Sequence, residues 1–202
     1  MTYKKGSRGE MVRQIQKALH LYPDGIFGPL TEERVKQFQK EHGLTVDGIV
    51  GPATLALLIP ARLKKSRRTI NEIIIHCTAT PEGRECTVTE IRRWHIQRGF
   101  NDIGYHYVIH LDGRVENGRN VDIAGAHCTG HNANSIGVVY VGGCAKDGKT
   151  PKDTRTDAQK SALANLLLDL RKLYPRATIH GHRDFANKAC PSFDATQEYR
   201  RF

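Results

Sequence analysis

The sequence lacks the features of a membrane-spanning or disulfide-stabilised protein. No apolar run reaches the roughly 18 residues that a transmembrane helix needs. The basic residues of the start, 1–11 (MTYKKGSRGEM), are not followed by the apolar stretch of a signal peptide. The five cysteines are odd in number and form no C-x-x-C pair, which argues against a secreted disulfide framework. We therefore expect no membrane span, and either synthesis in the cytoplasm without a signal peptide or a leader that has been removed.

Acidic side chains are also few relative to basic ones. The 202 residues carry 31 Lys+Arg against 21 Asp+Glu, a net charge of +10, which raises the question of a nucleic-acid partner. Half of this excess lies in residues 61–69 (ARLKKSRRT), which hold five basic and no acidic side chains. A nucleic-acid-binding domain more often spreads its basic residues over one folded face. We interpret 61–69 as a solvated basic linker between two domains and expect no nucleic-acid partner.

An internal repeat organises the first sixty residues. Residues 24–31 (DGIFGPLT) recur 23 positions later as residues 47–54 (DGIVGPAT), with six of eight positions identical. The Asp-Gly pair predicts a tight turn, and the Gly-Pro pair predicts the start of a helix. With a further helix predicted before the first turn, residues 1–60 form a compact three-helix domain.

This repeat resembles the peptidoglycan-binding domain that accompanies many cell-wall hydrolases. The resemblance covers residues 4–59 and includes both DGIxGPxT segments. It implies binding of wall glycan or stem peptide, and it leaves the chemistry to the rest of the chain.

Residues 70–202 alternate predicted strands with predicted helices. Capping boxes at 87–90 and 156–159 each open a helix. Short runs rich in β-branched residues predict strands at 72–76 (EIIIH), 104–111 (GYHYVIHL), 135–141 (SIGVVYV) and 177–180 (ATIH). This alternation predicts an α/β domain with a mixed central sheet flanked by helices.

Three possible metal ligands lie at or beyond the ends of predicted strands. His76 ends the first strand, His182 follows the last, and Cys190 lies eight residues further on. Two imidazoles and a thiolate suit Zn²⁺, and three protein ligands leave a fourth position for water. His180 competes with His182, because residues two apart on a strand face the same side, whereas Cys77 should point away from His76. From spacing alone, a structural role for these histidines is the alternative.

Four motifs in one order resemble a single enzyme family. They are residues 75–80 (IHCTAT), 102–107 (DIGYHY), 134–138 (NSIGV) and 188–193 (KACPSF). Together they are similar to the zinc-dependent N-acetylmuramoyl-L-alanine amidases, which include phage lysozyme-type amidases and peptidoglycan recognition proteins. The resemblance runs from about residue 71 to residue 194.

This resemblance implies a role for seven residues. Carried over by position, it implies zinc ligands at His76, His182 and Cys190, and it selects His182 over His180. It implies catalytic roles for Tyr105 and Lys188, whose proton and positive charge can stabilise an oxyanion. It places His127 and Asn134 in the substrate groove.

These observations predict a modular peptidoglycan hydrolase: a binding domain at 1–60, a basic linker at 61–69 and a zinc amidase domain at 70–202. Zinc-activated water would cleave the amide between N-acetylmuramic acid and L-alanine. We expect a monomeric phage or prophage endolysin or a bacterial autolysin. The alternatives are a zinc peptidase acting elsewhere in the stem peptide and a recognition protein that binds the wall without cutting it.

Overall fold

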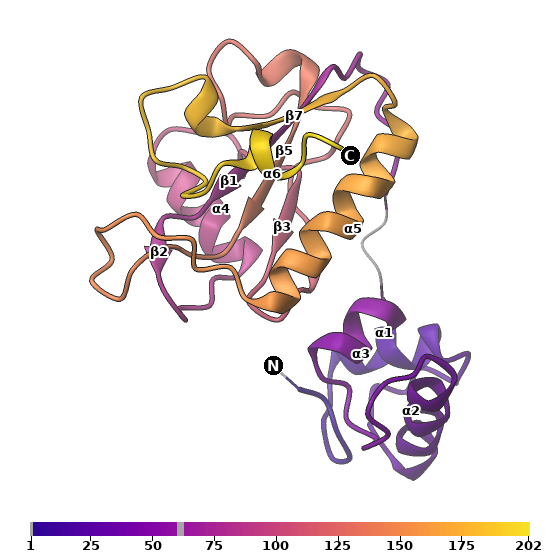
Figure 1. Cartoon of the computed structure of the whole chain (residues 1–202). Coiled ribbons are helices and arrows are strands. Elements are labelled where there is room, and N and C mark those ends of the chain that lie inside the picture. The colour runs from indigo at the N-terminus through magenta and orange to yellow at the C-terminus, as the bar shows by residue number, and fades with distance from the viewer. Residues whose placement is uncertain (1, 60–62) are drawn as a thin grey trace. The chain divides into compact units, whose positions relative to one another are not determined.

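The chain divides into two compact units, residues 1–61 and 62–202. The computed structural model describes residues 2–59 and 63–202, which Figure 1 shows as ribbons. Each unit has its own buried apolar core.

The first unit contains three helices, α1 (Glu10–Ala18), α2 (Pro29–Glu41) and α3 (Pro52–Leu58). Both α2 and α3 begin with a proline that follows a glycine, as the repeat predicts. The two Asp-Gly turns place Gly25 and Gly48 at φ values of 79° and 74°, a region that glycine adopts without strain. The predicted three-helix domain is therefore confirmed.

A buried glutamine holds each turn of the repeat. The Gln16 side chain donates to Asp24 Oδ1 and to the Ile26 carbonyl at 2.7 and 3.0 Å, and its Oε1 accepts from the Gly25 amide at 2.8 Å. Gln39 makes the same three bonds 23 positions later, to Asp47, Ile49 and Gly48. The repeat is thus a repeat of hydrogen bonds as well as of sequence.

The second unit is built on a mixed five-stranded sheet in the order β4-β3-β5-β1-β7. Strands β3, β5, β1 and β7 are parallel neighbours, and β4 runs antiparallel to β3. The strands of this sheet are β1 (Glu72–Cys77), β3 (Tyr107–Ile109), β4 (Val115–Asn117), β5 (Ser135–Tyr140) and β7 (Thr178–Gly181). A separate two-stranded parallel sheet pairs β2 (Thr80–Pro81) with β6 (Gly143–Cys144). The predicted mixed α/β sheet is confirmed, although β3 is shorter than the strand expected over 104–111.

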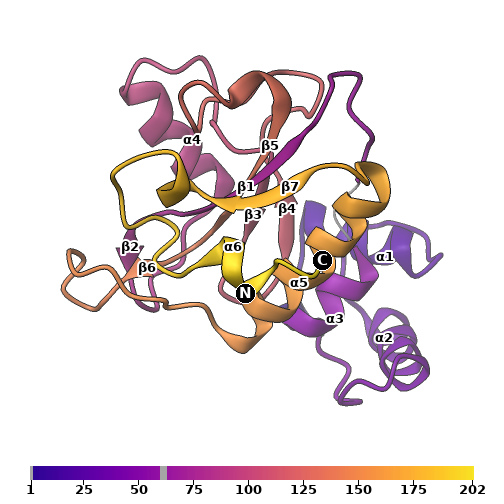
Figure 2. The same ribbon diagram turned by 45° about the horizontal axis from the view of Figure 1, so that its top comes forward.

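Helices cover both faces of this sheet (Figure 2). The long helix α5 (Asp157–Leu173) packs its leucines against one face, and α4 (Val88–Gln97) packs on the other. The predicted capping box of α5 is present, with Thr156 and Gln159 each bonding the other's backbone amide. The loops also contain three short helical elements: η1 (Asn132–Asn134), η2 (His182–Asp184) and α6 (Ala195–Glu198).

The basic segment differs from the solvated linker expected over 61–69. Ala61 and Arg62 lie outside the described residues, but residues 63–69 bind to the second unit. Ser66 is buried, with its amide donating to the Tyr174 hydroxyl at 2.6 Å. Arg68 donates to the carbonyl of Ala133 at 2.8 Å and to that of Ser135 at 3.1 Å. Composition did not reveal this role, because guanidinium groups that bind backbone carbonyls look like solvated charges in a sequence.

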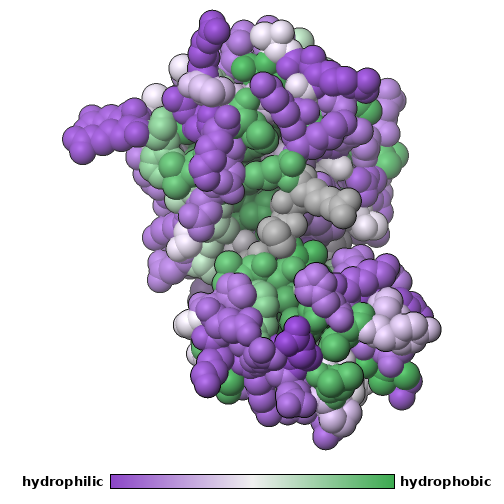
Figure 3. Space-filling view, turned by 90° about the vertical axis from the view of Figure 1, so that its right-hand side faces the viewer, coloured by the Kyte–Doolittle hydropathy of each residue, from purple (hydrophilic) through white to green (hydrophobic). Residues whose placement is uncertain are grey.

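Within residues 2–59 and 63–202, we find no helix whose length and apolarity would let it cross a membrane. Hydrophilic residues are spread over both units on the face that Figure 3 shows.

Candidate functional site

The site begins with a histidine on the central strand β1. Successive strand residues point to opposite faces, and Ile75 and Cys77 belong to the core against α5. His76 therefore points to the other face, where it is 1% exposed. His182 opens η2 directly after β7, the neighbour of β1. Parallel strands thus bring two histidines distant in sequence to one end of the sheet.

Three ligand atoms converge at this point. One side-chain nitrogen each of His76 and His182 and the Cys190 sulfur all lie within 4.8 Å of one another. His76 Nδ1 is 3.8 Å from Cys190 Sγ, and the two imidazole centroids are 4.6 Å apart. His180 instead pairs with Thr178, its Nε2 lying 2.8 Å from the hydroxyl. The structure therefore brings together the three predicted ligands and leaves out their competitor.

Backbone contacts hold Cys190 in place. Its sulfur accepts a hydrogen bond from the Cys77 amide at 3.3 Å, and its carbonyl accepts one from the Arg183 amide at 2.7 Å. The Tyr140 hydroxyl donates to the next carbonyl, that of Pro191, at 2.6 Å. The cysteine is thus tied to strands β1 and β5 rather than to a free loop.

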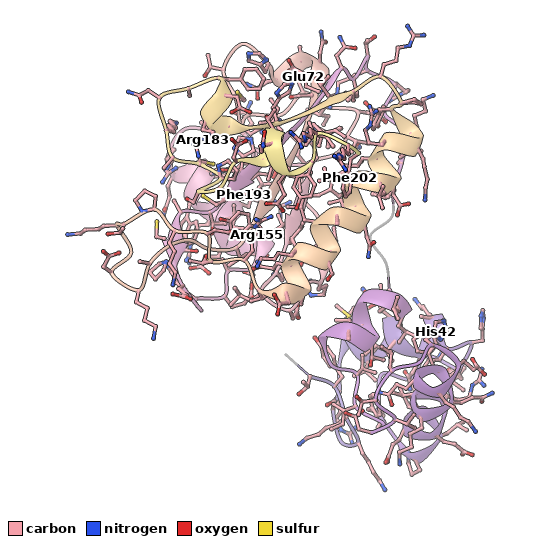
Figure 4. The ribbon with its side chains drawn as sticks, viewed as in Figure 1. His42, Glu72, Arg155, Arg183, Phe193 and Phe202 are labelled. Carbon is pink, nitrogen blue, oxygen red and sulfur yellow. The ribbon has the colours of Figure 1, made fainter. Side chains whose placement is uncertain are left out.

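A buried arginine anchors the segment beyond Cys190. The Arg155 guanidinium lies 3.3 Å from the centroid of the Phe193 ring and forms ion pairs with Asp153 and Glu198 at 2.8 and 2.9 Å. Figure 4 shows Arg155 and Phe193 close together below Arg183. This cluster restrains the chain just after Cys190 and Pro191, which are themselves held by the contacts described above.

Electrostatics keep the two imidazoles neutral. Burial, followed by the neighbouring His127 and His182, holds the pKa of His76 well below its usual value. Burial and the charge of Lys188 lower the pKa of His182. The Cys77 thiol and burial raise the pKa of the Cys190 thiol, so a thiolate there requires a nearby cation. The cluster therefore offers two neutral nitrogens and a sulfur that a metal ion would ionise.

Both predicted catalytic side chains lie near this cluster. Tyr105 comes just before β3, and its ring centroid is 5.1 Å from that of His76. Burial raises the pKa of Tyr105, so the phenol keeps its proton at neutral pH. Lys188 is exposed and precedes Cys190 by two residues. A protonated phenol and an ammonium group are suitable donors to an oxyanion.

The two residues expected in a substrate groove lie in different places. Both ring nitrogens of His127 already have partners, His76 Nε2 at 3.0 Å and Ser135 Oγ at 3.3 Å. Asn134 is exposed and precedes β5, whose first residue pairs with Glu72, whereas His76 pairs with Val139. Four residues of strand, about 13 Å, separate these two register positions.

The structure therefore places His127 beside His76 and Asn134 at the start of β5, and a substrate groove that includes both stays a prediction. Glu72 marks the Asn134 end of β1 and lies away from Arg183, which follows His182 (Figure 4). This separation could not be predicted from spacing, because the two residues are only seven positions apart in the sequence.

Sequence reasoning assigned no role to the residues that surround His127. Ser135 is fully buried against its ring. A Cβ added at Gly125 or Gly137 would lie 2.3 or 2.5 Å from the His127 ring, so only glycine leaves room for it. Ser135 and Gly137 belong to the NSIGV motif, which was the available signal, but a motif does not reveal what its residues contact.

The donor set fits a tetrahedral metal ion. Bond lengths of about 2.0 Å to nitrogen and 2.3 Å to sulfur would place these two ligands about 3.5 Å apart. The observed separation of 3.8 Å between His76 Nδ1 and Cys190 Sγ is close to that value. Three ligands on one side also leave room for a fourth that is not protein.

A mixed sheet with this cluster at its strand ends defines a class of peptidoglycan hydrolases. The family model described as N-acetylmuramoyl-L-alanine amidase matches residues 66–193, and the model described as a putative peptidoglycan binding domain matches residues 8–58. The chain belongs to the N-acetylmuramoyl-L-alanine amidase family. It is an amidase of the endolysin type with an added N-terminal peptidoglycan-binding domain.

Individual relatives agree with this assignment. The endolysin of Enterobacteria phage K11 is 45% identical over 128 residues, which cover 63% of this chain and 84% of that protein. The endolysin of Escherichia phage T7 is 44% identical over 130 residues, covering 64% and 85%. Among solved structures, amidase LysC from Clostridium intestinale has a TM-score of 0.55 at 28% identity, covering 65% of this chain and 83% of that one. Drosophila PGRP-LB has a TM-score of 0.56 at 27% identity, covering 73% and 91%.

Proposed function

We propose that this amidase uses zinc held by His76, His182 and Cys190 to cleave the bond between N-acetylmuramic acid and L-alanine. The convergence of the three ligand atoms within 4.8 Å is the observation that supports it. Zinc is the metal that best suits two neutral imidazoles and one thiolate in a tetrahedral site. When bound there, zinc supplies Lewis acidity to the scissile carbonyl and makes water a better nucleophile at neutral pH.

The remaining chemistry falls to Tyr105 and Lys188. As the amide carbon becomes tetrahedral, its oxygen acquires negative charge that needs hydrogen-bond donors or positive charge nearby. The Tyr105 phenol keeps its proton and can donate it in a hydrogen bond to this oxygen. Lys188 is two residues from Cys190 and can bring its ammonium group to the same place. Asn134 is left out of the proposed reaction centre because it lies at the start of β5, at the other end of the strand from the residue that pairs with His76.

The two units divide the work on an insoluble substrate. We assign wall binding to residues 1–60 and catalysis to the second unit, in which we include residues 63–69 because they bind to it. Linking a binding module to a catalytic one raises the local concentration of substrate, so a weak anchor has a large effect. We propose that the protein acts as a monomer on the bacterial cell wall and has no nucleic-acid partner.

Digestion of purified peptidoglycan tests the proposal. We expect mass analysis to find stem peptides with free L-alanine amino groups together with intact glycan strands. A zinc chelator should stop their release, and added zinc should restore it. New amino groups at other positions of the stem peptide would indicate a peptidase instead. Wall binding without any released fragment would indicate a recognition protein.

A further inference from the structure

A buried chain of side chains lies behind His76, on the side away from Cys190. His76 Nε2 is 3.0 Å from His127 Nδ1, and His127 Nε2 is 3.3 Å from Ser135 Oγ. His76, His127 and Ser135 are all buried, at 1%, 8% and 0% exposure. The other nitrogen of His76, Nδ1, faces Cys190.

When both imidazoles are neutral, the hydrogen-bonded row His76–His127–Ser135 can hold its protons in two ways. The two nitrogens that face each other share one hydrogen, because each neutral imidazole has one N–H. If His127 Nδ1 carries it, the proton of His76 must sit on Nδ1, and that nitrogen has no lone pair for a metal. If His76 Nε2 carries it, the Nδ1 lone pair is free, and His127 holds its own proton on Nε2 and donates it to Ser135 Oγ.

We propose that His127 is a positioning residue that accepts a hydrogen bond from His76 Nε2–H and so holds His76 in the tautomer that presents Nδ1 to the metal. The proposal rests on the metal role of His76 in the proposed function. Ligating histidines usually donate their second N–H to a carboxylate, a carbonyl or water. Here a second imidazole takes that place.

The surroundings fix the His127 ring in this orientation. Its backbone amide donates to Asn132 Oδ1 at 2.8 Å, and that oxygen also accepts from the Cys128 amide at 3.0 Å. Gly125 and Gly137 flank the ring so closely that a Cβ at either position would overlap it. The ring therefore has little freedom to turn its Nδ1 away from His76.

Two other buried histidines in the same unit bind backbone groups instead of a second ring. His95 Nδ1 accepts from the Gly104 amide at 2.8 Å. His106 Nδ1 accepts from the Gly137 amide at 2.9 Å, while its Nε2 lies 3.1 Å from the Ile123 carbonyl. Backbone groups set the tautomers of these two rings, whereas a ring nitrogen of His127 faces the proposed ligand His76.

Two amide substitutions separate the proposed contact from general effects on packing. In His127→Asn, the side-chain oxygen can occupy the position of Nδ1 and still accept from His76. In His127→Gln, the amide reaches the position of Nε2 and faces Ser135 instead. We expect the zinc dissociation constant, measured by competition with a chromogenic chelator, to rise about 10- to 100-fold in His127→Gln and in His127→Leu. We expect His127→Asn to stay within a few-fold of wild type.

A spectroscopic measurement reports the tautomer directly. In the zinc-loaded full-length protein, nitrogen-15 NMR of the histidine side chains should show His76 protonated at Nε2 and His127 protonated at Nε2. Proton signals that place the His76 proton on Nδ1 would overturn the proposal. So would zinc affinities that are equal in wild type, His127→Gln and His127→Leu.

Controls distinguish this inference from the proposed function. Circular dichroism and the melting temperature of each metal-free variant show whether it folds. If His127→Leu does not fold, the zinc affinities of His127→Asn and His127→Gln are still compared with each other. Wild-type protein that binds no zinc would overturn the proposed function together with this inference. Wild-type protein that binds zinc with no difference between Asn and Gln would overturn the inference alone.

Discussion

Two buried glutamines in residues 2–59 each bind a turn of their own repeat, whereas two buried histidines in residues 63–202, His76 and His127, bind each other. Gln16 and Gln39 use both ends of their amides on turn residues, which leaves no atom for a ligand. His76 uses one nitrogen on His127 and directs the other toward Cys190. In the first unit the buried polar groups are used up in stabilising turns. In the second unit a buried histidine keeps one ring nitrogen free to bind a ligand.

The first way to test this comparison is to remove a proposed ligand. Cys190→Ser should abolish nearly all amidase activity on purified peptidoglycan, as should a zinc chelator on wild type, because both remove the proposed Lewis acid. Retention on the wall should persist, since residues 1–60 are unchanged. Cys144→Ser is the matched control, because Cys144 is a buried thiol outside the cluster. Wild-type activity in Cys190→Ser would show that the cluster is structural like the glutamines.

A smaller loss should follow removal of an oxyanion donor. Tyr105→Phe and Lys188→Ala should each lower the rate of amide hydrolysis by about 10²- to 10³-fold. Zinc affinity should remain that of wild type, because neither side chain belongs to the ligand cluster. Tyr107→Phe serves as the control, since Tyr107 is two residues further on and lies in the core against α5. A loss of zinc in step with the loss of rate would instead make Tyr105 or Lys188 part of the metal site.

The glutamines should affect stability and leave the chemistry alone. Gln16→Ala and Gln39→Ala each leave turn groups unpaired, which should cost about 1–3 kcal/mol in the first unit. Hydrogen exchange of peptides from residues 2–59 should then speed up by about 5- to 150-fold, and by similar amounts in the two variants. Exchange of peptides from residues 63–202 should not change. Gln37→Ala, at an exposed position of α2, is the control.

The glutamine pair also shows what sequence can and cannot reveal. The repeat found at 24–31 and 47–54 extends backward at the same offset, since residues 12–16 (VRQIQ) match residues 35–39 (VKQFQ). The signal for Gln16 and Gln39 was therefore present. The strand pattern likewise predicted the mixed sheet. Two of the three clustered residues, His76 and Cys190, lie in the motifs, and the family resemblance added His182.

Other parts of the site depend on packing that no local pattern encodes. His127 lies 51 residues from His76 in sequence, and only the fold brings the two rings together. Arg68 looks like a solvated charge in a basic run, yet it binds carbonyls more than 60 residues away. Spacing along the chain predicts which residues share a strand or helix face, but a loop can place its side chains in several directions.

The smallest expected effect concerns a third kind of buried polar group, His110, which lies 2.9 Å from Glu85 and 3.0 Å from Glu116. Burial opposes the charged imidazole, but hydrogen bonds to Glu116 and Glu85 outweigh it and raise the pKa of His110. A raised pKa in the folded state means that its stabilisation is complete below the unfolded value of about 6.5 and is lost as pH rises through the folded value. In turn, the hydrogen bond from His110 lowers the pKa of Glu116 to about 2, so that contribution is lost as pH falls from about 4.5 toward 2.

Melting temperatures of wild type and His110→Gln, compared from pH 5 to 9, isolate this group because the other histidines are common to both proteins. The melting temperature of wild type should exceed that of His110→Gln most near pH 5 to 6, and this difference should shrink as the pH rises above 6.5. Amidase activity at a fixed pH should be similar in the two proteins, because His110 is not among the ligands that converge on His76. A difference in melting temperature that stays constant across this range would mean that His110 is held neutral, as burial holds His76.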